Sequence, residues 1–217
     1  MGVGDSRYGR RVAPLPREES RIDEFDWSIL SVATPRAVVR GQLEFSWWEL
    51  GQRLETVTQD EFLWEPGPGA LSVRRRGEST SPRAFGVGEW VVEWPGSGDH
   101  PGPRTVAWLV AHLTDVLSER YDWTFGDHRA RRATLTYSGE VGAAVGELTR
   151  VADLWRAGIA GMSDDDIFTV GFSQATEIDQ QSPFAHLVAH INREIIHHGS
   201  EIFTLTDLYR VRGGAHV

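Results

Sequence analysis

Residues 186–202 read HLVAHINREIIHHGSEI and carry the most informative pattern in the chain. Apolar residues at positions 187, 191 and 195 recur every fourth residue, which is the spacing of one face of an α-helix. Four ionisable residues recur at the same interval: His186, His190, Glu194 and His198. A step of four residues turns an α-helix by only about 40° and rises about 6 Å, so neighbouring members of this series share a face. The stretch therefore predicts an amphipathic helix with a polar stripe beside its apolar face.

The polar stripe is a candidate metal site, because any two neighbouring members lie close enough to hold one ion. Side chains next to an apolar face are partly buried, buried polar groups need partners, and a shared divalent cation satisfies several at once. The alternative is a set of solvated or capped side chains along a helix edge. The spacing alone does not decide between these two interpretations. It also does not show which of the four residues would bind a metal.

Three further stretches show apolar residues at helical spacing. They span roughly residues 35–58, 103–120 and 138–158, and the stretch described above extends over about 182–209. Thr34 followed by Pro35, and Ser182 followed by Pro183, are typical of helix starts. Four such helices with one long connection are typical of an antiparallel four-helix bundle, so the sequence predicts an all-α fold.

The long connection, residues 62–103, is rich in Gly, Pro and Ser and includes the alternating run EWVVEW at 89–94, which favours a partly β-hairpin structure. A connection of this length can cover one end of a helical bundle and shape a pocket, so Trp64, Trp90 and Trp94 are candidates for the pocket wall. Trp108 is more typical of core packing. Residues 1–30 lack periodicity and are expected to form an N-terminal arm outside one helical domain of residues 31–217.

Composition narrows the functional classes. The formal net charge of −9 and the isolated basic run at 74–76 argue against nucleic-acid binding. No stretch of 18 apolar residues predicts a membrane span, and the first residues lack the apolar segment of a signal peptide, so a cytoplasmic location is expected. The chain contains no Cys, so imidazole and carboxylate groups must hold any metal, and any thiol chemistry needs a thiol from another molecule.

His112 is the best candidate for a third ligand from elsewhere in the chain. It lies within the otherwise apolar stretch 106–117, so its side chain is not expected to be fully solvated. A hydrogen-bonded histidine of the core is the alternative interpretation. His100 and His128 fall in loop-like segments and are weaker candidates.

Three segments, taken in order and separation, resemble the DinB/YfiT-like superfamily. They are WEPGPGALSV at 64–73, TVAWLVAHL at 105–113 and NREIIHHGSEI at 192–202, within a resemblance that covers about residues 35–210. The resemblance implies a four-helix bundle that holds zinc or nickel through His112, Glu194 and His198. Many relatives have His at the position of Glu194, whereas the mycothiol-dependent maleylpyruvate isomerase branch is similar to this chain in using Glu. At 204–209, TLTDLY, the chain lacks an Arg that similar chains often have before the Asp.

Two His and one carboxylate leave coordination positions free, as in catalytic metal sites. The resemblance thus implies a divalent-metal-dependent enzyme that transfers or adds a mycothiol-like thiol to a small electrophile, or a metal-assisted hydrolase. The ligand set alone also suits non-haem iron. The alternative class is a non-enzymatic bundle with a structural metal, acting as a stress-related binding or dimerisation module, and a homodimer is expected from the resemblance alone.

Three residues near the ligands are candidates for orienting them or for moving protons. His197 points to a neighbouring face of the helix, His190 lies one turn before Glu194, and Glu201 follows His198 by three residues. Glu201 is placed to accept the second ring N–H of an imidazole ligand.

Overall fold

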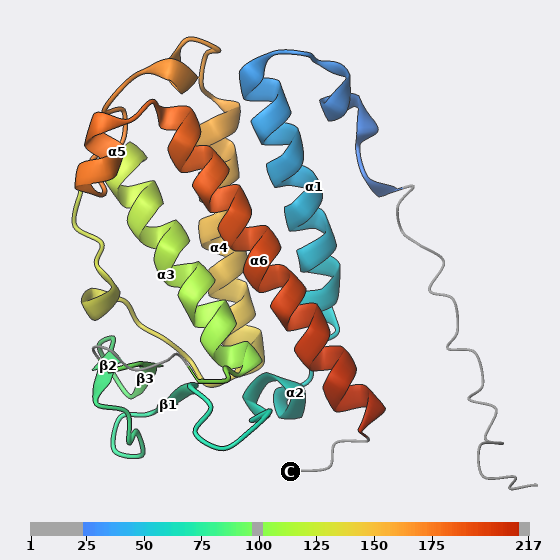
Figure 1. Ribbon diagram of the computed structural model, residues 1–217, viewed down its shortest axis with the longest axis vertical. Helices are drawn as coiled ribbons and strands as arrows, with labels where there is room; N and C mark the ends of the chain where they lie inside the picture. The colour runs from blue at the N-terminus through green and yellow to red at the C-terminus, as the bar shows by residue number, and fades with distance from the viewer. Residues whose placement is uncertain (1–23, 97–101, 213–217) are drawn as a thin grey trace, which may run out of the picture.

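Four long helices make up most of the protein and lie side by side (Figure 1). The structure is a computed structural model that describes residues 24–96 and 102–212. The long helices are α1 (Pro35–Glu55), α3 (Val106–Phe125), α4 (Val141–Ala160) and α6 (Phe184–Val211). Each one overlaps a helix predicted from the sequence, with ends that differ by a few residues. The chain is thus mostly helical, as predicted.

Short helical segments connect the long ones. They are the α-helices α2 (Gln59–Leu63) and α5 (Glu177–Gln181), and the 3-10 helices η2 (Trp27–Ser31), η3 (Arg132–Thr134) and η4 (Asp166–Phe168). Of the predicted arm, residues 1–23 lie outside the described residues, whereas η2 packs against α1. Among the described helices, none is both long enough and apolar enough to cross a membrane.

Threonines cap two of the long helices. The Thr34 hydroxyl accepts the backbone N–H of Ala37, with Pro35 in the first helical position, which confirms the predicted start of α1. Thr105 caps α3 in the same way by accepting the N–H of Trp108. The start of α3 is therefore three positions after the Pro103 that the sequence suggested.

Two pairs of long helices run antiparallel. The Thr34 hydroxyl, at the start of α1, donates a hydrogen bond to Asp164, which follows the end of α4. Arg104, just before α3, pairs with Glu201 in the second half of α6. Antiparallel packing therefore relates α1 to α4 and α3 to α6.

The helices α3 and α4 run in the same direction, which corrects the prediction of a wholly antiparallel arrangement. Phe125 at the end of α3 packs against Gly158 near the end of α4. Between them, residues 126–140 carry the chain back along the outside of the molecule (Figure 1). There the N–H of Val87 donates to the carbonyl of Leu135. The sequence predicted only one long connection, and this second one reverses the expected direction of α4.

A small three-stranded sheet covers the end of the helices where α3 begins (Figure 1). Its strands are β1 (Val73–Arg75), β2 (Arg83–Phe85) and β3 (Trp90–Trp94), in the order β1-β3-β2 with antiparallel pairing. The predicted alternating run is the central strand. The connection is therefore partly β, as expected, but a third strand extends the predicted hairpin. The indole N–H of Trp108 donates to the carbonyl of Glu93, 2.6 Å away, and fastens the sheet to α3.

The apolar core lies between the four helices. Its largest fully buried side chains come from all four long helices and from two short ones, α2 and η4. They are Leu43, Leu50, Phe62, Leu109, Leu113, Leu117, Leu148, Trp155, Ile159, Ile167, Phe184 and Ile191. The contact between α3 and α6 within this core is what brings the candidate ligands together.

Candidate metal centre

Two neighbouring helices bring three candidate ligands to one point. Glu194 and His198 lie four residues apart on the inward face of α6, and both are buried. His112 lies on α3, and its side chain is 13% exposed. The candidate ligand atoms of these three residues all lie within 4.8 Å of one another, so the group could hold a metal ion.

One carboxylate oxygen lies between the two imidazoles. Oε2 of Glu194 is 3.3 Å from Nε2 of His112 and 3.3 Å from Nε2 of His198. The two rings are nearly perpendicular, with centroids 4.7 Å apart. Atoms held about 2.0–2.2 Å from a zinc ion at tetrahedral angles lie about 3.3–3.6 Å from one another. The two separations therefore suit ligands of a single divalent ion.

The electrostatics of the group favour a cation among these atoms. Hydrogen bonds with His112 and His198 hold the pKa of Glu194 well below its usual range. Burial lowers the pKa of His112, which favours the neutral imidazole that a metal ligand needs. Burial also acts to lower the pKa of His198, but Glu194 and Glu201 outweigh it, so the net shift is upward. The carboxylate is thus an anion, and the upward shift at His198 shows that the position between these groups favours a positive charge.

Glu201 holds His198 from behind. Its Oε2 lies 3.4 Å from Nδ1 of His198, on the side of the ring away from Glu194. Arg104 fixes Glu201 in turn, with Nε 3.0 Å from Oε1 and Nη2 2.9 Å from Oε2. A carboxylate behind a ligating histidine sets the orientation of the ring. Glu201 thus contacts His198, and its role in orienting the ring stays a prediction.

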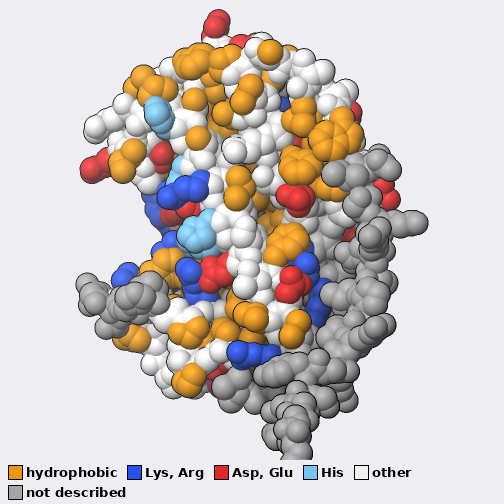
Figure 2. Space-filling view, turned by 45° about the vertical axis from the view of Figure 1, so that its right-hand side comes forward, with side chains coloured by type: hydrophobic (Ala, Val, Ile, Leu, Met, Phe, Trp, Pro, Cys, Tyr) orange, Lys and Arg blue, Asp and Glu red, His pale blue; other side chains and the backbone are white. Residues whose placement is uncertain are grey.

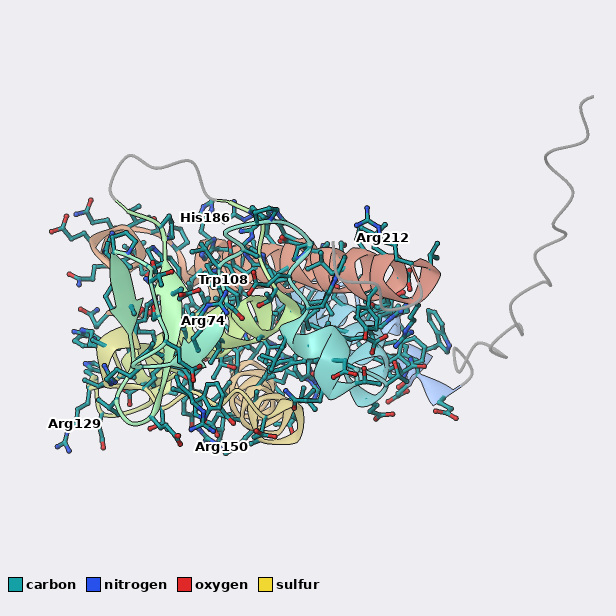
Figure 3. All side chains as sticks on the ribbon, turned by 90° about the horizontal axis from the view of Figure 1, so that it is seen from below. Arg74, Trp108, Arg129, Arg150, His186 and Arg212 are labelled. Atoms are coloured by element: carbon teal, nitrogen blue, oxygen red, sulfur yellow. The ribbon has the colours of Figure 1, made fainter. Side chains whose placement is uncertain are left out.

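Two tryptophans surround His112. The Trp108 ring stacks on the imidazole with centroids 5.0 Å apart, and the Trp94 ring lies 5.7 Å away. Trp108 lies inside the molecule (Figure 3), so its predicted role in packing is combined with contact to the site. Nδ1 of His112 is buried and has no hydrogen-bond partner among the described residues. The aromatic rings keep water from this side of the imidazole.

The other predicted pocket residues lie elsewhere. Trp64 is only 3% exposed and packs edge-on against Tyr209, so the structure corrects its assignment from pocket wall to core. Trp90 is partly buried, with its ring under the guanidinium of Arg75. Of the three tryptophans proposed for the pocket wall, Trp94 is the one in contact with the His112 ring.

The remaining histidines of α6 lie at the edge of the centre. Nδ1 of His190 is 3.8 Å from Oε1 of Glu194 and accepts a hydrogen bond from Arg193. His197 is exposed and stacks on His198 with centroids 4.7 Å apart. His197, His198 and Glu201 form a second group that could hold an ion. His186 is exposed (Figure 3).

Sequence reasoning missed three arginines near the centre. Arg193 donates to Oε1 of Glu194 at 2.6 Å, Arg104 fixes Glu201, and the charge of Arg132 contributes to lowering the pKa of His112. The contacts of Arg104 and Arg132 depend on the path of segments outside α6, so no spacing pattern points to these two arginines, whereas Arg193 lies next to Glu194 within α6. The adjacency of Arg193 to Glu194 in sequence was the one available signal.

The fold and the site together define a mostly helical protein with a His–Glu–His cluster suited to a divalent metal. The family model of the DinB superfamily matches residues 42–202, and the chain belongs to this superfamily. The matched range contains all three candidate ligands. No significant match was found among curated proteins or among solved structures.

Proposed function

We propose that the protein is a divalent-metal-dependent enzyme that binds zinc or nickel through His112, Glu194 and His198 and promotes attack of a small thiol, or of water, on a small electrophile. The observation that supports it best is the position of one carboxylate oxygen 3.3 Å from each of two imidazole nitrogens. Three protein ligands leave positions free for a reactant, as in catalytic zinc sites. When bound, such an ion acts as a Lewis acid and lowers the pKa of a thiol or water.

The side chains of the protein set up this chemistry in distinct ways. Arg193 holds Oε1 of Glu194 and leaves Oε2 directed between the imidazoles. Glu201 accepts from Nδ1 of His198 and keeps Nε2 available as a ligand. Trp94 and Trp108 shield His112 from water, which strengthens electrostatic interactions at the centre.

A thiol co-substrate is the finer part of the proposal. The chain has no Cys, so the nucleophile must come from another molecule. Glu at position 194 resembles the mycothiol-dependent maleylpyruvate isomerase branch. In the proposed displacement, the thiol sulfur bonds to the electrophilic carbon as the bond from that carbon to its leaving group breaks, and the thiol proton passes to the leaving group or to water. In the proposed addition, the π electrons of the attacked double bond take up the proton instead.

Metal binding is tested by comparing two adjacent histidines. Calorimetric titration of metal-free protein with Zn²⁺ and Ni²⁺ is expected to show one tight site. His198→Ala should weaken binding by more than the roughly 10–100-fold typical of residues that only orient a ligand. His197→Ala, which changes the exposed neighbour, is the matched control and should bind as the wild type does. Equal losses in both variants would refute the assignment of the ligands.

The reaction is tested with defined thiols. Metal-loaded protein is incubated with monochlorobimane and mycothiol, bacillithiol or glutathione, and conjugate formation is followed by fluorescence. A rate above the metal-free protein and above His198→Ala supports thiol transfer. If no thiol gives such a rate but the metal-loaded protein cleaves ester or amide substrates, the hydrolytic form of the proposal stands instead.

A structural metal is the second candidate function, because the ligands come from two different helices. An ion held by His112 on α3 and by Glu194 on α6 would tie these helices together. This alternative predicts that chelation lowers the melting temperature while neither thiol transfer nor hydrolysis is detectable. Catalysis lost on chelation and restored by Zn²⁺ or Ni²⁺ would exclude it.

A further inference from the structure

Arginines gather around the candidate metal centre although the chain as a whole is acidic. Figure 2 shows blue arginine side chains beside pale-blue histidines and red acidic side chains on one face of the molecule. Arg104 directs two nitrogens at Glu201, and Nη2 of Arg193 contacts both Glu194 and His190. These two arginines are therefore committed to the ligands or to the groups that hold the ligands.

Arg132 is held differently and keeps its outer end available. Its Nε contacts Oδ2 of Asp115 at 2.5 Å, and this is the guanidinium hydrogen bond found for Arg132 within the described residues. Oδ1 of Asp115 is buried and has no hydrogen-bond partner in the same part of the chain, so the two groups are not paired through two parallel bonds. Among residues 24–96 and 102–212, no hydrogen bond engages either terminal nitrogen of Arg132, so both can donate to another group.

The position of Arg132 is fixed next to His112. Asp115 is 1% exposed and follows His112 by three residues on α3, which puts both side chains on neighbouring parts of one face. The guanidinium carbon of Arg132 lies 3.8 Å from the Trp94 ring, and this ring also contacts His112. Asp115 and Trp94 thus hold the cation on two sides while its side chain remains 27% exposed.

A cation in this place is unfavourable for a metal centre unless an anion accompanies it. The Trp94 ring contacts both the guanidinium of Arg132 and the His112 ring, so the charge of Arg132 lies near the candidate ligand and would oppose a divalent ion there. A substrate carrying a negative group would turn this repulsion into attraction. The planar guanidinium with two free nitrogens matches a carboxylate, which it can bind through two parallel hydrogen bonds.

We propose that Arg132, seated on Trp94 and Asp115, binds a carboxylate carried by the substrate of the metal centre. This inference rests on the proposed function and narrows its substrate to carboxylate-bearing small molecules. Arg132 selects the substrate and Asp115 positions Arg132. Neither residue is required for holding the metal.

The test compares two metal-binding probes that differ in one carboxylate. Acetohydroxamate and the monohydroxamate of succinate are titrated into Co²⁺-loaded protein, and binding is followed by the visible absorption of the ion. The wild-type protein is expected to bind the carboxylate probe at least about tenfold more tightly, the factor that about 1.4 kcal/mol of added contact provides.

Substitution of Arg132 should remove this preference alone. In Arg132→Met the ratio of the two affinities is expected to fall below about twofold, with the affinity for acetohydroxamate unchanged. The double variant Arg132→Met with Asp115→Asn avoids an unpaired buried carboxylate and should behave in the same way if the single variant folds poorly. Arg129→Met is the matched control, because Arg129 lies in the same connection and points outward (Figure 3).

The outcomes separate this inference from the proposed function. A preference for the carboxylate probe that survives in Arg132→Met, or is absent from the wild type, overturns the role of Arg132 while the metal centre stands. Failure of acetohydroxamate to change the Co²⁺ spectrum of the wild type overturns both. Loss of the preference in Arg129→Met as well as in Arg132→Met also overturns the inference, because a general loss of positive charge would then explain it.

Discussion

Replacement of Glu201 by Gln probes how strongly the metal centre depends on the group behind His198. The change removes the charge that faces Nδ1 of His198 and leaves Arg104 without its anionic partner. Removing such an orienting carboxylate typically costs about 10–100-fold in metal affinity. The contact of 3.4 Å is longer than the usual 2.7–3.2 Å of a hydrogen bond, so the lower part of this range is expected. We predict a loss of about 10–30-fold, or about 1.4–2 kcal/mol.

The pH dependence of this loss has a defined sign. Glu201 also contributes to raising the pKa of His198, so it makes the proton a stronger competitor for the site in the metal-free protein. Removing Glu201 relieves this competition at low pH but not above the pKa of His198. The loss of affinity in Glu201→Gln should therefore be larger at pH 8.5 than at pH 6.

The assay is a competition titration of Zn²⁺ against a chelator of known affinity at both pH values. Glu147→Gln is the matched control, because Glu147 also pairs with an arginine, Arg150, but on α4. The control should bind Zn²⁺ as the wild type does. Unchanged affinity in Glu201→Gln, or a loss that is larger at pH 6 than at pH 8.5, would refute this account of Glu201.

Three further predictions concern stability. Trp155 is fully buried, so Trp155→Ala should cost about 3–5 kcal/mol, measured as a lower urea midpoint at an unchanged slope; a cost below 1 kcal/mol would contradict its place in the core. A Cβ at Gly158 would lie 2.5 Å from the Phe125 ring, so Gly158→Ala should destabilise the folded protein. A Cβ at Gly146 meets nothing within 4 Å, so Gly146→Ala should stabilise the folded protein by up to about 1 kcal/mol. The opposite order of the two melting temperatures would refute the packing of α3 on α4. Burial raises the pKa of Asp115 to about 6, above its unfolded value near 3.9, so its contribution to stability is present below pH 4 and is lost as the pH rises through 6. The wild type should thus lose up to about 3 kcal/mol relative to Asp115→Asn between pH 4 and 7 in paired denaturation curves, and parallel curves would contradict the raised pKa.

The long helices were predictable because their signals are local. Apolar residues at helical spacing and the Thr34 cap act within one or two turns of the chain. The direction of α4 was not predictable, because it depends on the path of residues 126–140. The Asp122 carboxylate starts this path by accepting the N–H groups of Asp127, Arg129 and Ala130, and a contact distant in sequence, from Val87 to Leu135, holds the returning segment.

The polar stripe of α6 shows why spacing could not choose the ligands. A drift of about 40° at each step of four adds up to about 120° between His186 and His198. The stripe therefore turns gradually from the outer face of α6 to its inward face. In the structure, His186 is exposed, His190 is partly buried, and Glu194 and His198 are buried. Which residues of the stripe face inward depends on where α3 packs against α6. The sequence of α6 alone does not determine this.

The arginines around the centre were beyond sequence reasoning for a related reason. Arg104 and Glu201 are 97 residues apart, and Arg132 reaches Asp115 only because the second connection returns beside the sheet. Their roles depend on tertiary packing rather than on spacing. The resemblance to the superfamily selected Glu194 and His198 as partners of His112, but it carried no information on these neighbours.

Anomalous diffraction from crystals grown with Zn²⁺ or Ni²⁺, with data collected on both sides of the absorption edge, shows directly where the protein binds the metal. We predict one anomalous peak about 2.0–2.2 Å from Nε2 of His112, from Oε2 of Glu194 and from Nε2 of His198. A peak between His197, Nδ1 of His198 and Glu201, the second group that could hold an ion, would contradict the assignment. No peak at either group in metal-soaked crystals would contradict the proposal of a metal centre.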